Sequence, residues 1–140
     1  MKIEISSSLT IRCDRDRVYS YLLDAENEVE WIEPIVRSEK TSAGEISEDT
    51  IFRQEAIDPR GTRFETDIIV DRLKFSELIV FKSWMSEYSF TSSYRLSLSK
   101  YGTKVEKSFE VKKNRISNSY SELSNSLISS AEIFKLAKCA

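Results

Sequence analysis

The side chains that offer chemistry in this sequence are hydroxyl and amide groups interleaved with aromatic rings. Gln54, Thr66, Ser92, Tyr88 and Tyr94 alternate with apolar residues at a spacing of two, which predicts that they share the inward face of a sheet. Burying such a group without a partner costs about 1–3 kcal/mol. Several of them on one inward face therefore indicate either a wet or ligand-binding cavity, or hydrogen bonds among the groups themselves.

The chain contains no histidine, which narrows the possible chemistry. A Ser–His or Cys–His nucleophile pair and a histidine-ligated zinc site are excluded. The acidic residues of the predicted strands fall mostly on the solvent-facing phase, so no two carboxylates are expected to face one substrate. The three glycines are scattered turn residues and form no phosphate-binding loop. We therefore predict no catalytic residue, no metal and no cofactor.

Two groups of charged residues are interpreted as solvated surface. The acidic group surrounds Trp31 and consists of Asp24, Glu26, Glu28, Glu30 and Glu33. The basic group consists of Lys100, Lys104, Lys107, Lys112, Lys113 and Arg115, and it is diluted by Glu106 and Glu110. The net charge of −2 and the lack of an evident pattern of basic residues interleaved with aromatic platforms predict no nucleic-acid partner.

The elements that must position these groups follow from the hydrophobic pattern. A length of 140 residues predicts a single domain over residues 1–140. Residues 3–13 alternate as a strand, Asp14 caps a helix over 15–24, and a second helical turn over 25–30 ends at Trp31. Strands are predicted at 35–41, 50–57, 63–73, 75–84, 87–99 and 103–112. A last helix is predicted from a stripe of apolar residues: Ile116, Tyr120, Leu123, Leu127, Ala131 and Phe134.

Turn residues predict the register of two hairpins. The sequence Asp58-Pro59-Arg60-Gly61 forms a turn that places Phe52, Gln54 and Ala56 opposite Ile68, Thr66 and Phe64. A tight turn at Tyr101-Gly102 pairs Leu98 with Val105 and Tyr94 with Phe109. That register puts Lys107 against Leu96, which is a poor match. In residues 75–84 both phases are apolar, so the inward phase is left open, and a strand buried on both faces predicts a homodimer through Leu78 to Trp84 as one possibility.

The order of elements predicts the fold class. Short helices and a long helix stand apart from the run of strands, which is typical of an α+β protein with an antiparallel sheet. We expect a curved sheet of six to seven strands, two short helices after the first strand, and a long C-terminal helix packed in the concave face of the sheet.

Several segments together resemble a known superfamily. The first strand, from Ile3 to Cys13, leads directly into a helix opened by Asp14, with Trp31 following the end of that helix. The stretch from Leu96 to Val105 is similar to a penultimate hairpin, and the long helix then ends the chain. Over nearly its whole length the chain resembles the START and polyketide-cyclase-like (SRPBCC) superfamily, whose fold is the helix-grip fold.

This resemblance implies a cavity between the sheet and the long helix. Members of the superfamily hold lipids, sterols, polyketides, plant hormones or quinones, a minority are cyclases or aromatases, and some act through protein partners. The residues expected to line the cavity are Trp31, Gln54, Phe64, Thr66, Ile68, Tyr88, Phe90, Ser92, Tyr94, Phe109, Tyr120, Leu123 and Leu127. For Trp31 a purely structural role, plugging the joint between helices and sheet, is the competing interpretation.

The sequence thus predicts a non-catalytic binding or carrier domain for a lipophilic small molecule. The alternatives are a polyketide cyclase or dehydratase that uses tyrosine hydroxyls, and a protein-interaction module without a small ligand. No secretory leader and no apolar run of about 20 residues is recognised, so a cytoplasmic protein without an integral membrane segment is expected. Cys13 and Cys139 are expected as reduced thiols.

Overall fold

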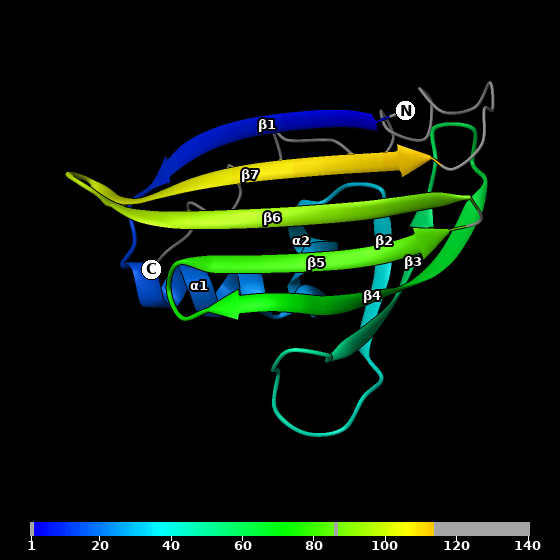
Figure 1. Ribbon diagram of the computed structural model, residues 1–140, viewed down its shortest axis with the longest axis horizontal. Helices are drawn as coiled ribbons and strands as arrows, with labels where there is room; N and C mark the ends of the chain where they lie inside the picture. Colours follow the sequence, from blue (N-terminus) through cyan, green and yellow to red (C-terminus); the bar gives the residue numbers. More distant parts are fainter. Residues whose placement is uncertain (1, 86, 114–140) are drawn as a thin grey trace.

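The computed structural model describes residues 2–85 and 87–113, and its main feature is one curved antiparallel sheet (Figure 1). The sheet has seven strands in the order β1-β7-β6-β5-β4-β3-β2. The strands are β1 (Lys2–Ile11), β2 (Ile35–Lys40), β3 (Ile51–Ile57), β4 (Arg63–Lys74), β5 (Leu78–Met85), β6 (Tyr88–Ser99) and β7 (Gly102–Lys113). From β2 onward each strand pairs with its neighbour in sequence, whereas β1 returns to pair with β7. This confirms the predicted α+β class and antiparallel sheet.

Three short helical segments connect the two edge strands, β1 and β2. They are α1 (Arg15–Leu23), the 3₁₀ turn η1 (Ala25–Asn27) and α2 (Glu28–Trp31). In Figure 1 they lie behind β4 and β5, on the side toward which the sheet curls. Asp14 caps α1 as predicted, because its carboxylate accepts a hydrogen bond of 3.0 Å from the Arg17 backbone N–H. The helical segments therefore cover part of the inner face of the sheet.

The buried apolar residues form two clusters on this inner face. The larger one joins α1 and α2 to the middle of the sheet and includes Val18, Leu22, Trp31, Phe81 and Tyr94. The smaller one consists of Tyr88, Phe90, Phe109 and Val111, with Ile3 packed against it. The inner face is thus divided between two packed regions that share strands β6 and β7.

The predicted register of the β3–β4 hairpin is confirmed. Phe52, Gln54 and Ala56 lie opposite Ile68, Thr66 and Phe64. The predicted register of the β6–β7 hairpin is wrong by two residues, because Lys100 and Tyr101 form the connection and Ser99 pairs with Gly102. Tyr94 consequently lies opposite Lys107, and Leu96 lies opposite Val105. A shift of two residues preserves which face each side chain occupies.

Gly102 fixes this turn against the end of β1. Its φ of +141° is a conformation that other residues rarely adopt, and a Cβ at this position would lie 2.1 Å from the carbonyl oxygen of Ile11. Next to it the hydroxyl of Thr103 donates a 2.8 Å hydrogen bond to the carbonyl of Cys13. The connection between β6 and β7 is therefore held directly against the segment that leads into α1.

Strand β5 shows which of its two apolar phases faces inward. Ile79 and Phe81 are buried on the inner face, whereas Trp84 on the other phase is 55% exposed. Because β5 lies between β4 and β6, its backbone edges are both paired. Only the outward-facing side chains near Trp84 remain available on this strand for contact with a second chain. A homodimer through this surface stays a prediction.

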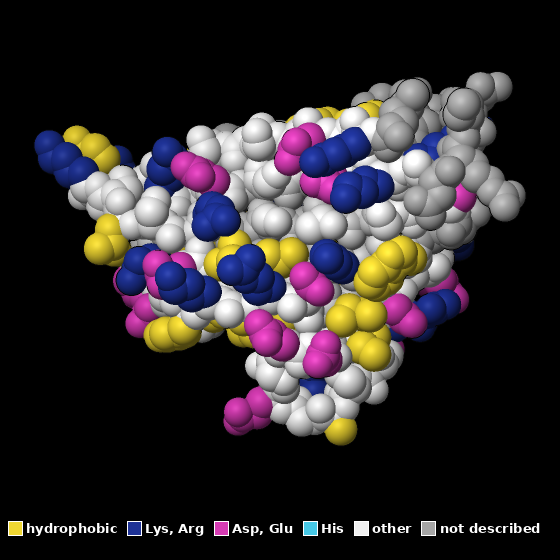
Figure 2. Space-filling view, in the orientation of Figure 1, with side chains coloured by type: hydrophobic (Ala, Val, Ile, Leu, Met, Phe, Trp, Pro, Cys, Tyr) yellow, Lys and Arg dark blue, Asp and Glu magenta, His cyan; other side chains and the backbone are white. Residues whose placement is uncertain are grey.

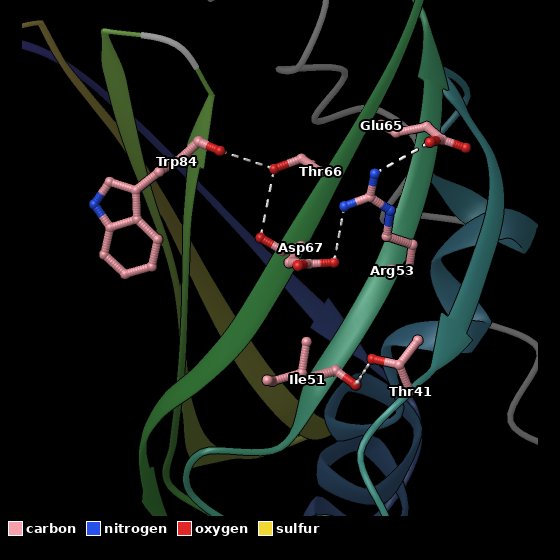
Figure 3. A network of polar contacts seen from close by, with 7 residues as sticks. All are labelled: Thr41, Ile51, Arg53, Glu65, Thr66, Asp67 and Trp84. Carbon is pink, nitrogen blue, oxygen red and sulfur yellow. Dashed lines mark hydrogen bonds and ion pairs between the residues drawn. The ribbon is translucent and has the colours of Figure 1, made fainter.

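The outer face of the sheet carries its charges in solvent. Figure 2 shows Lys and Arg side chains mixed with Asp and Glu over this face, with apolar patches between them. On β3 and β4 the guanidinium of Arg53 lies 3.1 Å from Glu65 and 3.1 Å from Asp67 (Figure 3). Such exposed ion pairs keep the outer face hydrated and contribute little to the free energy of folding.

Three further predictions concern the C-terminal helix, the state of the cysteines and the absence of a membrane segment. The long helix expected from residue 116 lies outside the described residues. Cys13 is disulfide-bonded in the structure, so the expectation of a reduced thiol is wrong for that residue. Among the helices of the described ranges, each is too short or too polar to cross a lipid bilayer.

Candidate ligand-binding pocket

A pocket of about 90 Å³ opens on the inner face between the two apolar clusters. On a scale where one water needs about 10–15 Å³, this leaves room for several waters or a small organic group. Apolar side chains form most of its wall, and a few polar groups converge on it. The lining residues are Glu28, Ile32, Ile35, Gln54, Ala56, Phe64, Thr66, Ile68, Phe81, Ser83, Phe90, Ser92, Tyr94, Lys107 and Phe109.

Most of the described residues that the sequence placed in a cavity lie at this pocket. They are Gln54, Phe64, Thr66, Ile68, Phe90, Ser92, Tyr94 and Phe109. Tyr88 belongs instead to the smaller apolar cluster, where its ring lies 6.2 Å from that of Phe90. Tyr120, Leu123 and Leu127 lie outside the described residues. The alternation pattern therefore identified the inward face but not the boundary of the pocket along it.

Trp31 lies behind the pocket wall. It is 2% exposed and packs edge-on against Tyr94, with ring centroids 6.1 Å apart. Its indole N–H is buried without a hydrogen-bond partner among the described residues. In this structure Trp31 supports Tyr94, which is the residue that lines the pocket.

A buried hydrogen-bonded chain runs from α2 to the sheet. The side-chain amide of Gln54 donates to the Glu28 carboxylate at 2.9 Å and to the Ser38 hydroxyl at 3.1 Å. Glu28 is 6% exposed and opens α2 three residues before Trp31. Residues three apart lie on the same side of a helix, so the turn that buries Trp31 also turns Glu28 inward.

Lys107 enters the same region from β7. It shares the inward phase of the strand with Val105 and Phe109, and it is 6% exposed. Its Nζ atom lies 4.9 Å from the centroid of the Trp31 ring and 5.7 Å from that of Tyr94. Within the described part of the chain, no hydrogen bond or ion pair reaches this nitrogen. The amine is therefore bounded by aromatic faces and by the pocket.

The burial of these groups changes their acid–base properties. Burial raises the pKa of Glu28, and the hydrogen bond from Gln54 and the charge of Lys107 oppose this only in part. Burial lowers the pKa of Lys107, against the attraction of Glu28. Burial and then the charge of Glu28 raise the pKa of Tyr94 well above its ordinary value. The pocket thus holds a carboxyl and a phenol with raised pKa values and an amine with a lowered pKa.

The sequence prediction missed Glu28 and Lys107. Both were interpreted as solvated surface charge, which is wrong because each side chain is buried. Two signals were present in the sequence: Lys107 falls in the apolar phase of its strand, and Glu28 precedes Trp31 by three. The acidic neighbours Glu26 and Glu30 are exposed as predicted. Residues of the wall that the pattern did not assign are Ile32, Ile35, Ala56, Phe81 and Ser83.

Thr66 illustrates a polar wall residue whose hydroxyl is already engaged. It donates a 3.0 Å hydrogen bond to the carbonyl of Trp84 across the β4–β5 pair (Figure 3). Thr66 therefore contributes shape more than polarity.

The described residues hold no group of three or more His, Cys, Asp or Glu side chains able to bind a metal. The polar groups of the pocket other than Thr66 belong to Glu28, Gln54, Ser83, Ser92, Tyr94 and Lys107.

Solved structures share this architecture. The two-domain aromatase/cyclase StfQ from the steffimycin biosynthetic pathway superposes with a TM-score of 0.73 at 16% identity, over 99% of this chain and 50% of that one. The Zhui aromatase/cyclase from Streptomyces sp. R1128 superposes with a TM-score of 0.75 at 10% identity, over 98% of this chain and 92% of the other. Ara h 8.0201 gives 0.72 at 12% identity, over 98% and 95%. The chain therefore spans about half the length of StfQ and nearly the full length of the other two.

These likenesses show the fold. The chain shares the α+β fold of these three proteins, in agreement with the fold that the sequence predicted. No protein-family model and no curated protein sequence matches the chain. At these identities the fold is what the likeness establishes, and the particular activity has to be argued from the pocket.

Proposed function

We propose that this chain binds a lipophilic small molecule that carries a polar group, with its apolar part against the wall of the pocket. The observation that supports this is the combination of an apolar wall with convergent buried polar groups, which is typical of small-molecule sites. Burial of apolar ligand surface contributes about 25 cal/mol per Å². The polar group of the ligand is oriented by Lys107, Tyr94 and Glu28.

The buried polar groups support binding more than they support folding. A lysine and a carboxyl taken out of water destabilise a core unless they are well paired. Here Glu28 has Gln54 as a partner, whereas the Lys107 nitrogen has two ring faces. A ligand oxygen in the pocket gives this nitrogen the hydrogen bond that the described residues do not supply.

Native mass spectrometry of the purified protein tests the proposal first. We expect an apolar mass that copurifies with the chain and disappears after extraction with organic solvent. A protein that carries no such mass, and that also fails to bind a neutral apolar probe such as N-phenyl-1-naphthylamine, contradicts the proposal.

Two neighbouring serines on β6 provide a matched pair of variants that locates the binding site. Ser92 lines the pocket, whereas Ser93 is on the other phase of the strand. Ser92→Leu fills the pocket, and we expect it to weaken binding of the probe at least tenfold. Ser93→Leu makes the same change on the outer face and leaves probe binding unchanged. Equal effects of the two variants place the binding site elsewhere.

A second candidate function is a cyclase- or dehydratase-like reaction in the same pocket. The observation that favours it is that three buried ionisable groups with shifted pKa values, Glu28, Tyr94 and Lys107, face one cavity. Turnover of a polyketide-like substrate that is lost in Tyr94→Phe, with binding retained, supports catalysis. Binding without turnover in the wild type supports the carrier function alone.

A further inference from the structure

The nitrogen of Lys107 has the surroundings of a nucleophilic amine. It is buried in an apolar wall, it lines the pocket, and the described residues give it no hydrogen bond or ion pair. Two lysines of the outer face, Lys82 and Lys104, differ in each respect. Lys104 lies 3.1 Å from Glu106 and Lys82 lies 3.5 Å from Asp71, and both are more than 40% exposed.

An amine attacks a carbonyl carbon only in its neutral form. Burial lowers the pKa of Lys107 and so enlarges its neutral fraction near neutral pH, while the charge of Glu28 and the ring faces of Trp31 and Tyr94 favour the charged form. Dehydration of the adduct then needs a proton donor close by. Glu28 lines the same pocket, and burial raises the pKa of its carboxyl, which favours the protonated form that a proton donor needs.

We propose that Lys107 forms an imine with a lipophilic aldehyde or ketone held in the pocket, an inference that rests on the proposed ligand binding at that site. The Nζ lone pair attacks the carbonyl carbon, the carbonyl π electrons move to oxygen, and a proton passes from nitrogen to oxygen to give a carbinolamine. The nitrogen lone pair then expels the hydroxyl, which leaves as water with a proton from Glu28. The iminium returns a proton to Glu28, so amine and carbonyl give imine and water without a change of oxidation state.

The imine is detected by reductive trapping of the full chain. The protein is treated with a limiting amount of 3-phenylpropanal and sodium cyanoborohydride near neutral pH, and labelling at each lysine is followed by peptide mass spectrometry. We expect Lys107 to be labelled at least ten times faster than Lys82 and Lys104. An excess of 3-phenylpropan-1-ol, which occupies the pocket but forms no imine, suppresses labelling at Lys107 and leaves the surface lysines unaffected.

The pH dependence provides a second readout on the wild-type protein. Because exposed lysines are almost fully protonated at neutral pH, their labelling rises steeply as the pH is raised from about 7 to about 9. Labelling of Lys107 rises less over the same range. The Ser92→Leu variant loses the preference for Lys107, and Ser93→Leu keeps it.

The matched alcohol separates the two proposals. If ligand-observed NMR shows that 3-phenylpropan-1-ol binds, but Lys107 is labelled no faster than Lys82 and Lys104, the imine is refuted while ligand binding stands. If neither the alcohol nor the aldehyde binds, the pocket is not a site for such molecules and both proposals fail. Preferential labelling of Lys107 that the alcohol suppresses supports both.

Discussion

Two adjacent residues of β3 have opposite surroundings. Arg53 points to the outer face, where it forms ion pairs with Glu65 and Asp67 in solvent (Figure 3). Gln54 points to the inner face, is 6% exposed, and donates hydrogen bonds to Glu28 and Ser38. Two consecutive residues of the strand therefore lie in opposite environments: the charges around Arg53 are hydrated, whereas the polar groups around Gln54 are buried away from water.

The difference indicates where function is located. Exposed ion pairs contribute little to stability and mainly keep the surface hydrated. A buried carboxyl beside a buried amine opposes folding unless both are compensated, so such groups are expected at sites with another role. On this reasoning we propose that the inner cluster of Glu28, Gln54, Tyr94 and Lys107 is the functional part of the sheet.

The largest expected effect comes from truncating the inner face next to these residues. Phe52 precedes Arg53, is fully buried, and packs edge-on against Phe81 at 6.5 Å. Phe52→Ala removes this packing and leaves a cavity, so we expect a loss of about 3–5 kcal/mol in the free energy of unfolding. Urea unfolding followed by circular dichroism measures it, and a loss below about 1 kcal/mol contradicts the assigned burial.

Changes to the buried pair of Glu28 and Lys107 should have a smaller effect on stability, and the effects of the two changes should not be additive. Glu28→Gln and Lys107→Met each remove one charge and leave the other without its counterpart. We expect the double variant to be more stable than the sum of the single changes predicts, with a coupling of about 0.5–3 kcal/mol. Additive effects in the double-mutant cycle contradict a direct interaction between the two groups.

The pH dependence of stability should report the buried carboxyl. Because the pKa of Glu28 is raised in the folded state, the folded protein binds this proton more tightly than the unfolded chain does. The favourable contribution is fully present below the unfolded pKa of about 4.5 and is lost as the pH rises to the folded pKa. Relative to Glu28→Gln, the wild type should lose stability over this interval. A difference between the two proteins that is independent of pH contradicts the assignment.

The smallest effect is expected on the outer face. Arg53→Ala removes both exposed ion pairs, and we expect a change in the urea midpoint close to the error of the measurement. The change should decrease further in high salt, because mobile ions screen exposed charges. A large, salt-independent loss contradicts the view that the outer pairs are dispensable.

The fold was predictable because its signals are local. Alternation identified the strands, Asp14 marked the start of α1, and the turn at Asp58 to Gly61 set the β3–β4 register. The β6–β7 register was wrong because the connection consists of Lys100 and Tyr101, with Gly102 already in the strand. The pairing of strands is a non-local property, and a register shift of two residues leaves each side chain on the same face, so the alternation pattern does not detect it.

The site was predictable only in its apolar part. Aromatic residues in phase with the core showed the inner face, but charged residues were assigned to water by their type. Glu28 and Lys107 are exceptions because their partners come from other elements: Gln54 on β3 for the carboxyl, and the rings of Trp31 and Tyr94 for the amine. Single-segment patterns carry no information on such partners.

Gly102 has a consequence for which side chains of β7 reach this site. Its backbone lies so close to Ile11 that a side chain at this position would clash with the Ile11 carbonyl oxygen. A one-residue shift of the strand that follows would reverse its faces, turning Lys107, Phe109 and Val111 to solvent and Glu106, Ser108 and Glu110 inward. Because this exchange would bury two carboxylates and expose part of the apolar core, it would oppose folding. The position of this turn, far from the pocket, thus decides which residues of β7 reach the interior.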